Sequence, residues 1–359
     1  ALNGGGTQLC IGSDRRVARP ASEAELTGGD AAAAMLVGTG DPIARLVGSY
    51  SRTIDFVDQF RAAGADFDYV WESRWIRDEG YMRVLGDTLV AAIARFGVEP
   101  GAIDRLLVPI HVRGVGDALA RRAGIRPEAV ADTLGQTVGD SGSAHPLLML
   151  AAALEAAQPG ERILVAGFGQ GADILLFETT EALARLAPRR GVAGHVARRR
   201  PDSNYLRFLF HRGLLDLDRG MRAEASQKQS LAALYRNRRT VLGLVGGRCT
   251  RTGTVQFPRS EISVSPNAGE VGTQEDYPLA ERRAAVVTYT ADRLAYSPAP
   301  PGLYGTIDFE GGGRMFVEFA DVEEGEVEVG RPMRMVFRIH AVDEPRDFPA
   351  YFWKAVPDD

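Results

Sequence analysis

Cysteine, lysine and long apolar runs are scarce in this sequence of 359 residues. Cys10 and Cys249 are too few for a disulfide framework, so a reducing cytoplasmic location is the default expectation. Only Lys228 and Lys354 are lysines among the 42 basic residues, which we interpret as codon bias. No apolar run reaches about 18 residues, and no charged leader precedes an apolar stretch. We therefore expect neither a membrane span nor a signal peptide.

The overall composition is that of an ordinary globular protein. The net charge is −5, with 45% hydrophobic and 25% charged residues, so nucleic acid is not an expected partner. The length allows two or three domains with cores of their own.

Apolar runs alternate with helical patterns over residues 1 to 180, which is typical of a layered α/β domain. We expect strands and helices at 9–12 (strand), 31–37 (strand), 44–53 (strand), 79–96 (helix), 105–111 (strand, RLLVPIH) and 115–123 (helix). Residues 55 to 78 are aromatic and charged without clean periodicity, as in a functional loop or a docking surface.

A glycine-rich turn, a helix and two buried strands are predicted over residues 135 to 178. The apolar spacing predicts the helix at about 143–157, and the runs ILVAGF and ADILLFE flank a GFGQG turn. Gly139, Ser141 and Gly142 crowd the turn before the helix. Backbone N–H groups there either meet an anionic or carbonyl oxygen or only form a tight helix entry.

The rest of the chain changes character twice. Residues 181–246 are basic and turn-rich, with two helical segments, and read as a linker with docking helices. Its arginines at 198–200 either meet phosphates or face solvent. The turn-rich knuckle GGRCTRTGTVQFP follows, and then about five short strands that fit a small barrel such as an OB-fold.

The order of several motifs carries a family resemblance. IGSDRR, GGDAAAAMLVG, VPIH and VGDSGSAHPLLMLAAALEAAQPGERILVAGFGQGAD together resemble the C-terminal half of thiolase-fold condensing enzymes, nearest the 3-hydroxy-3-methylglutaryl-CoA synthase group. Residues 230–356 resemble the zinc-ribbon/OB-fold proteins that accompany or are fused to such enzymes. The implied fold class is an α/β thiolase-like layered half-fold, a degenerate zinc ribbon and an all-β OB-fold barrel. The implied boundaries are 1–180 (thiolase-like), 181–246 (linker and docking helices), 247–275 (ribbon) and 276–359 (OB-fold).

The resemblance implies acyl-CoA chemistry. Family members acylate a cysteine from a thioester and then form or break a carbon–carbon bond, with a histidine base and an oxyanion hole. Cys10 lies inside a predicted strand, where a small thiol is ordinary core packing. In the family the nucleophile precedes the SDRR-like strand by a helix, and this sequence starts only about a dozen residues before that strand, so we expect the catalytic cysteine to be absent from this sequence. We expect the first half of the fold to be missing here or supplied by another chain.

Three residues match catalytic positions of the family. His111 matches the catalytic histidine, or is only a surface histidine at a strand end. Asp140 stands where the synthases usually have asparagine, and an ionised carboxylate donates no hydrogen bond to an oxyanion. Asp140 is therefore protonated, or acts as a base, or this side of the site has a different role from that in the synthases. His145 either replaces a donor or is a helix-entry histidine with a backbone partner. By the same resemblance, a further set of residues would lie at the substrate: Gly139, Ser141, Gly142, Gly169, Gly171, Tyr69 and Tyr81.

The aromatic segment and the knuckle each leave alternatives. Some thiolase-like lyases use tyrosine as acid or base, so Tyr69 or Tyr81 is an alternative catalytic group; otherwise they line a pocket or interface together with Trp71 and Trp75. Related ribbons place cysteines at four positions, of which only the first remains a cysteine here: Cys249, Thr252, Ser263 and Ala268. We expect no zinc and no cofactor, with the knuckle held by packing of residues such as Val255 and Phe257.

Two functions from different classes remain. The first is an acyl-CoA-processing acyltransferase or lyase that makes or breaks a carbon–carbon bond at a thioester. The second is a non-catalytic OB-fold scaffold that binds a thiolase-like partner and acyl-CoA. The missing cysteines favour the scaffold, while the SDRR, GFGQG and OB-fold motifs fit both. Either a homodimer or a complex with a thiolase-like subunit is expected.

Overall fold

The chain folds into two compact units, Ala1–Asp216 and Leu217–Asp359. The computed structural model describes residues 6–218, 230–266, 269–297, 299–343 and 346–358. Within these residues no helix is long and apolar enough to cross a membrane.

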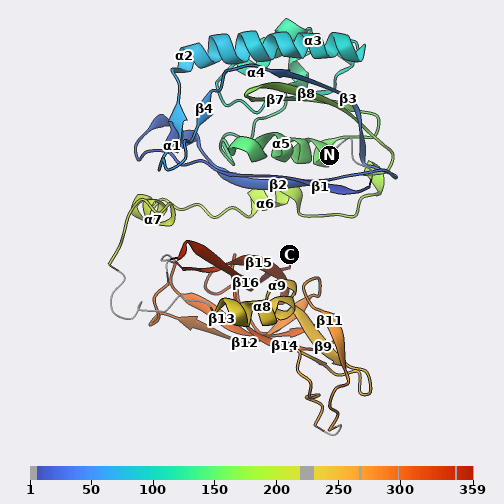
Figure 1. Ribbon diagram of the computed structural model, residues 1–359, viewed down its shortest axis with the longest axis vertical. Coiled ribbons are helices and arrows are strands. Elements are labelled where there is room, and N and C mark those ends of the chain that lie inside the picture. The colour runs from blue at the N-terminus through green and yellow to red at the C-terminus, as the bar shows by residue number, and fades with distance from the viewer. Residues whose placement is uncertain (1–5, 219–229, 267–268, 298, 344–345, 359) are drawn as a thin grey trace. The chain divides into compact units, whose positions relative to one another are not determined.

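A four-stranded sheet forms the centre of the first unit (Figure 1). Its order is β3-β8-β7-β6, from β3 (Ala44–Thr53), β8 (Gly171–Thr179), β7 (Arg162–Gly169) and β6 (Arg105–Leu107). The β3–β8 and β8–β7 pairs are antiparallel, and β7–β6 is parallel. The chain reaches the parallel pair through helices, as a parallel connection requires.

Successive residues of the central strands point into two different cores. Leu164 and Ile174 belong to the core beneath the helices η1 (Ile76–Leu85), α3 (Gly86–Phe96) and α4 (Val115–Ala123). Ile163 and Val165 face the opposite core, against α5 (His145–Ala156). This period-two alternation is what strands buried on both faces require.

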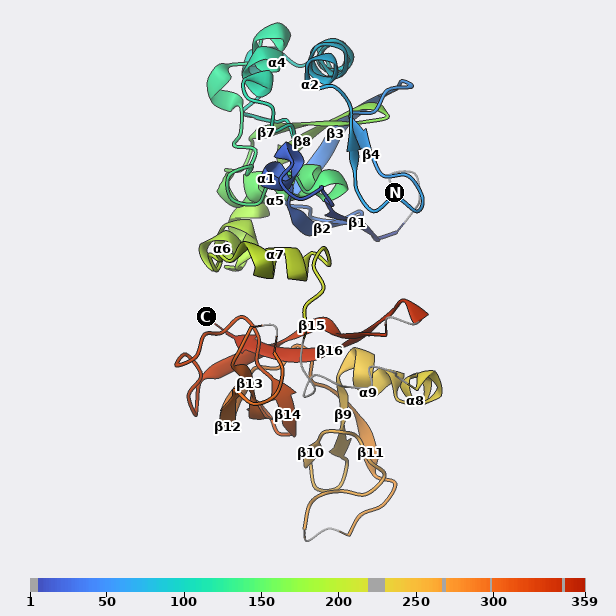
Figure 2. The same ribbon diagram turned by 90° about the vertical axis from the view of Figure 1, so that its left-hand side faces the viewer.

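A β-hairpin covers the other side of α5. It consists of β1 (Gln8–Arg15) and β2 (Asp30–Val37), joined through α1 (Glu23–Thr27), as Figures 1 and 2 show. A Cβ atom at Gly12 would lie 2.8 Å from the carbonyl oxygen of Ser143, so glycine permits this close approach. The unit is thus layered as helices, sheet, helix and hairpin.

The chain from Ser73 to Phe96 is one continuous helical segment with an irregular centre. It starts as α2 (Ser73–Trp75), continues as the π-helix η1 and ends as α3, which stops at Gly97 with φ +65°. π-Helical geometry is rare and is often found at functional sites. Tyr81 lies in the π-helical part. The segment follows a short hairpin of β4 (Gln59–Phe60) and β5 (Tyr69–Val70).

Shorter helices complete the first unit: η2 (Pro100–Ala102), η3 (Pro127–Ala129), η4 (Gly142–Ala144), η5 (Leu183–Arg185), α6 (Gly191–Ala197) and α7 (Tyr205–His211). The carboxylate of Glu155 on α5 accepts a hydrogen bond from the Ala193 N–H at 3.1 Å, which fixes the start of α6.

The second unit is built on antiparallel strands. After α8 (Leu231–Arg236) and α9 (Arg238–Gly243), the strands β9 (Val245–Cys249), β10 (Val255–Gln256) and β11 (Gln274–Pro278) pair in the order β10-β9-β11. A five-stranded sheet follows in the order β14-β13-β12-β15-β16, from β12 (Ala284–Asp292), β13 (Gly302–Phe309), β14 (Arg314–Glu318), β15 (Pro332–Asp343) and β16 (Phe348–Pro357). Val255 lies in the core of this unit, with Phe257 packed against it.

One predicted strand is shorter than expected. RLLVPIH was expected to remain a strand as far as His111, but β6 ends at Leu107. Pro109 has no N–H to offer a neighbouring strand, and the Ile110 N–H turns back to the Val108 carbonyl at 2.8 Å. His111 therefore lies in a loop four residues beyond β6. The predicted boundaries at 180, 246 and 275 stay predictions.

Candidate active site

His111 is placed by the loop after β6, against the start of α5. Its ring lies 4.6 Å from that of His145, measured between centroids, at an interplanar angle of 77°. Both ring nitrogens of His111 are buried and have no hydrogen-bond partner among the described residues. Burial lowers the pKa of His111, and the neighbouring His145 lowers it further. His111 is therefore a neutral imidazole at neutral pH.

His145 is the first residue of α5, and both of its nitrogens are bonded. Nε2 lies 2.7 Å from the Thr133 carbonyl oxygen, which only accepts hydrogen bonds, so Nε2 carries the proton. Nδ1 lies 2.9 Å from the Ser141 hydroxyl and accepts from the Ser141 N–H at 3.3 Å. Ser141 and His145 are 0% and 1% exposed. The ring is thus held as one tautomer at the helix entry.

Asp140 lies at the centre of a hydrogen-bond network and is ionised. Its Oδ1 accepts from the Gly142 N–H at 2.9 Å, and its Oδ2 accepts from Nε2 of Gln59 at 3.1 Å. Burial alone would raise the pKa of Asp140, but these two donors and the positive charge of Arg16 outweigh it and lower the pKa. Of the three states considered from the sequence, the protonated one is therefore disfavoured.

The hairpin of β4 and β5 brings a second carboxylate to the site. Asp58 accepts a hydrogen bond from the Tyr81 hydroxyl at 2.8 Å and from the Gln59 N–H at 2.8 Å. Burial raises the pKa of Asp58 even though these donors lower it. Burial and the nearby Asp58 charge also raise the pKa of Tyr81. Tyr81 therefore keeps its proton and donates it in the hydrogen bond to Asp58.

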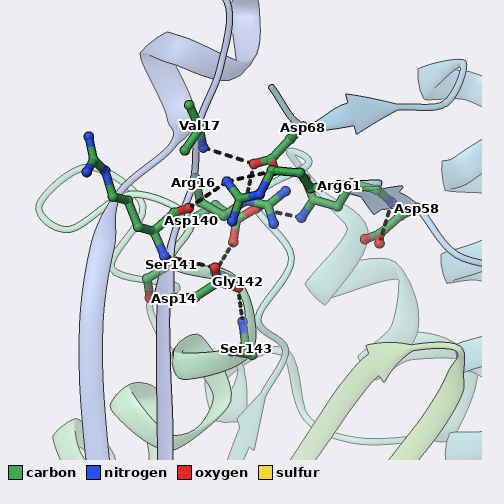
Figure 3. A network of polar contacts seen from close by, with 12 residues as sticks. Asp14, Arg16, Val17, Asp58, Arg61, Asp68, Asp140, Ser141, Gly142 and Ser143 are labelled. Carbon is green, nitrogen blue, oxygen red and sulfur yellow. Dashed lines mark hydrogen bonds and ion pairs between the residues drawn. The ribbon is translucent and has the colours of Figure 1, made fainter. Parts of the chain in front are cut away.

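Charged residues from β1 and the following loop close one side of the network. Figure 3 shows the Arg16 side chain close to Asp68 and Asp140, and its Nε lies 3.5 Å from Oδ2 of Asp68. Arg61 reaches the other oxygen of Asp68 at 3.4 Å. Oδ2 of Asp14 accepts from the Ser143 N–H at 3.0 Å. Two arginines thus surround Asp68, and Arg16 also contributes positive potential at Asp140.

The glycines before α5 permit close packing. Gly142 has φ +53°, and a Cβ atom there would lie 2.2 Å from Oδ2 of Asp14. Gly139 has φ +79°, and its Cβ atom would lie 2.9 Å from the carbonyl oxygens of Thr27 and Gly28. Both positions therefore require glycine for backbone reasons, which supports the structural interpretation without testing the functional one.

Some predicted site residues lie elsewhere. Tyr69 is 56% exposed and packs at the surface against Phe60 and Trp71. Gly169 and Gly171 form the turn between β7 and β8, where the Cβ position of Gly171 is occupied by the Arg52 carbonyl. Cys10 is half-buried in β1. The structure therefore brings together His111, Asp140, Ser141, Gly142 and His145, whereas Tyr69 lies at the surface.

Sequence reasoning missed Asp58, Gln59 and Arg16. The first two lie in a segment without periodicity, and Arg16 belongs to the SDRR motif, which was used only to recognise the family. One signal was available: Asp58 and Gln59 are polar residues in an aperiodic segment, and that segment leads into the helix that carries Tyr81.

Two groups bear on metal binding. His111, Asp140 and His145 each offer a ligand atom within 4.8 Å of the others, the one such group of three or more in the described part of the chain. Metal binding would require His145 to give up a bond to Ser141 or Thr133. In the knuckle, Cys249 is buried with its sulfur 3.2 Å from Oγ1 of Thr273, while Ala268 lies outside the described residues.

Two family models match separate parts of the chain. Residues 93–175 match the C-terminal region of 3-oxoacyl-[acyl-carrier-protein] synthase III, and residues 277–338 match the C-terminal OB-fold domain of ChsH2. The chain therefore carries a thiolase-like layered region followed by an OB-fold domain, which confirms the predicted fold class.

Hydroxymethylglutaryl-CoA synthases are similar in sequence to the first part. The enzyme of Methanopyrus kandleri is 29% identical over 178 residues, covering 49% of this chain and 51% of the relative. That of Archaeoglobus fulgidus is 28% identical over 207 residues, covering 57% and 60%. A crystal structure of HMG-CoA synthase complexed with CoA aligns with TM-score 0.44 at 19% identity, over 62% of this chain and 61% of that one. The chain spans about half the length of the curated relatives it matches.

Proposed function

We propose that this chain takes part in acyl-CoA chemistry and that its site makes or breaks a carbon–carbon bond next to a thioester. The observation that carries the proposal is the state of His111, a neutral, buried imidazole beside the ionised Asp140, with two ring nitrogens that no described residue hydrogen-bonds. The sequence similarity to hydroxymethylglutaryl-CoA synthases supports the substrate class. The proposed chemistry needs no resident cofactor.

His111 would act as the base. A neutral imidazole takes the proton from the carbon next to the thioester carbonyl; the C–H bond breaks, and its electron pair moves to the carbonyl oxygen as an enolate. The same base takes a hydroxyl proton in the cleavage direction. Burial lowers the pKa of His111 most and the neighbouring His145 adds to this, while the bonds of His145 to Ser141 and Thr133 fix its own place.

Gln59 would supply a donor to the oxyanion. A carboxylate can only accept, so the charge on Asp140 requires the NH2 group of Gln59, rather than its oxygen, to face it. One N–H is used on Asp140, and the second remains to donate to a substrate oxygen. Asp140 in this proposal is a positioning residue. Its carboxylate cannot donate a hydrogen bond, but it holds the Gln59 amide, which can.

Proton exchange tests the proposal without needing a nucleophile. An acyl-CoA deuterated at the α-carbon is incubated with the chain in water, and loss of deuterium is followed by mass spectrometry. We expect His111→Gln to slow exchange by about 10²- to 10⁴-fold, the usual contribution of a positioned base. Bound acyl-CoA with an exchange rate unaffected by this substitution would refute the role of His111.

A scaffold function is the second candidate, and the outer face of the β1–β2 hairpin favours it. Leu9, Ile11 and Leu36 are 61%, 65% and 70% exposed, and Leu9 pairs directly with Leu36. An apolar cluster of this kind is typical of a surface that another protein covers. We propose a thiolase-like subunit or a second copy as its cover. Light scattering of the wild type and of Ile11→Asp tests this, since one outward charge should lower the molar mass of the assembly.

A further inference from the structure

A cavity in the second unit has four arginines in its lining. It measures about 420 Å³, within the usual size of small-molecule sites. It lies where α8 and α9 meet β9 and β11, and its charged lining comprises Arg236, Arg238, Arg239, Arg259, Glu261 and Asp276. Four arginines and two carboxylate residues therefore line one hollow.

The four arginines of the lining outnumber its two carboxylates, so the cavity carries an excess of positive charge. Asp276 is shared by two arginines: Arg259 at 2.6 Å and Arg239, which contacts its other oxygen. Arg259 also donates to the Gln274 carbonyl at 2.9 Å, which fixes its orientation. One carboxylate thus positions two guanidinium groups, each of which keeps further N–H donors for a ligand.

The two remaining arginines have no carboxylate partner among the described residues. Arg238 is held over the Tyr235 ring at 4.5 Å and donates to the Tyr235 carbonyl at 2.8 Å. The side chain of Arg236, at the end of α8, makes no hydrogen bond or ion pair with any residue that the structure describes. A planar guanidinium fork matches the oxygens of a phosphate. In addition to Arg239 and Arg259, the cavity therefore offers an anion Arg238, which Tyr235 positions, and Arg236, whose side chain has no bond to a described residue.

We propose that this cavity binds a nucleotide-type ligand that carries at least two phosphate groups. The excess of arginine selects the phosphates. Glu261, which only accepts hydrogen bonds when ionised, would repel a bare phosphate but accept from a ribose hydroxyl or a base amine. A volume of about 420 Å³ also exceeds what a phosphate alone requires. The cavity belongs to the second unit and His111 to the first, and the binding proposed here does not depend on the chemistry proposed for His111.

Calorimetry with the full chain distinguishes the possible sources of this ligand. The probes are ADP, adenosine 3′,5′-bisphosphate, coenzyme A, inorganic diphosphate and adenosine. We expect the three nucleotides to bind, diphosphate to bind more weakly, and adenosine not to bind. Affinity should fall as salt is raised from 50 to 200 mM, because exposed charges are screened. Coenzyme A binding more tightly than ADP would identify a CoA ester as the source, and the reverse would identify a free nucleotide.

Substitutions locate the binding. Arg236→Ala and Arg238→Ala should each weaken ADP binding by about tenfold or more, the usual effect of losing a hydrogen bond to a charged group. Arg293→Ala is the matched control, because Arg293 is an exposed arginine of the same unit that is paired with Glu324. Circular dichroism checks that each variant is folded. Three results would overturn the proposal. They are no nucleotide binding by the wild type, equal binding by the wild type and both cavity variants, and nucleotide binding no tighter than that of diphosphate.

Discussion

Replacing Gln59 by leucine removes the proposed oxyanion donor and leaves the base in place. Gln59 is half-buried and reaches Asp140 through one hydrogen bond of 3.1 Å, so leucine keeps the size of the side chain but not the amide. Loss of one oxyanion donor typically costs about 10²- to 10³-fold in rate. We expect α-proton exchange to fall by about 100-fold, with little change in acyl-CoA affinity, since the donor acts on the charge that develops during the reaction.

A second substitution separates catalysis from folding. The lost bond to a charged group lowers stability by about 1.5–3 kcal/mol, so melting temperatures must be measured alongside the rates. Asp140→Asn places an amide beside the same substrate oxygen while its carbonyl still accepts from the Gly142 N–H. In the Gln59→Leu background, Asp140→Asn should restore exchange to within about tenfold of wild type. Equal exchange rates in Gln59→Leu and wild type, or no recovery in the double variant, would refute the reasoning.

Three further predictions concern pH and packing. Because burial and His145 lower the pKa of His111, the exchange rate should fall only as the pH drops below about 6.5, the ordinary value for histidine; a half-maximum above 6.5 in the pH profile would contradict this. Gly142→Ala places a Cβ atom against Asp14 at a positive φ and should lower the free energy of unfolding by about 1–3 kcal/mol in a urea titration. Leu164→Ala empties a site that is 0% exposed in the central sheet and should cost about 2–5 kcal/mol, whereas a cost below 1 kcal/mol would mean that the core collapses around it.

Periodicity predicted the elements of the fold wherever burial decides the structure. The strands β2, β3, β7 and β8 and the helices α4 and α5 lie where their apolar patterns placed them, because each must bury one or both faces. The π-helix had no signal of its own, because the apolar spacing of residues 79–96 is that of an ordinary helix. The strand expected to continue to His111 failed at Pro109, a local feature that the apolar run concealed.

The site was only partly predictable for a different reason. Histidines and glycines at the helix entry stand out in a sequence because few residue types can replace them. The partners that set their chemistry come from distant segments: Gln59 and Asp58 lie about 80 residues before Asp140, and Arg16 lies further away still. Those contacts exist only once Gln59 of the β4–β5 hairpin reaches the turn before α5, and a hairpin of two-residue strands has too little pattern to predict that.

The two carboxylates of the network indicate which groups can move protons. Their environments shift the two pKa values in opposite directions: burial dominates at Asp58, whereas donors and Arg16 dominate at Asp140. Tyr81, an alternative acid or base on sequence grounds, donates its hydroxyl proton to Asp58 and has a raised pKa, so it rarely becomes the phenolate that a base must be. Tyr69 lies at the surface. Asp140 is bound by two donors and too acidic to hold a proton at neutral pH. Among these groups, His111 alone combines a lowered pKa with ring nitrogens that have no hydrogen-bond partner among the described residues, and for this reason we propose it, rather than either tyrosine, as the base.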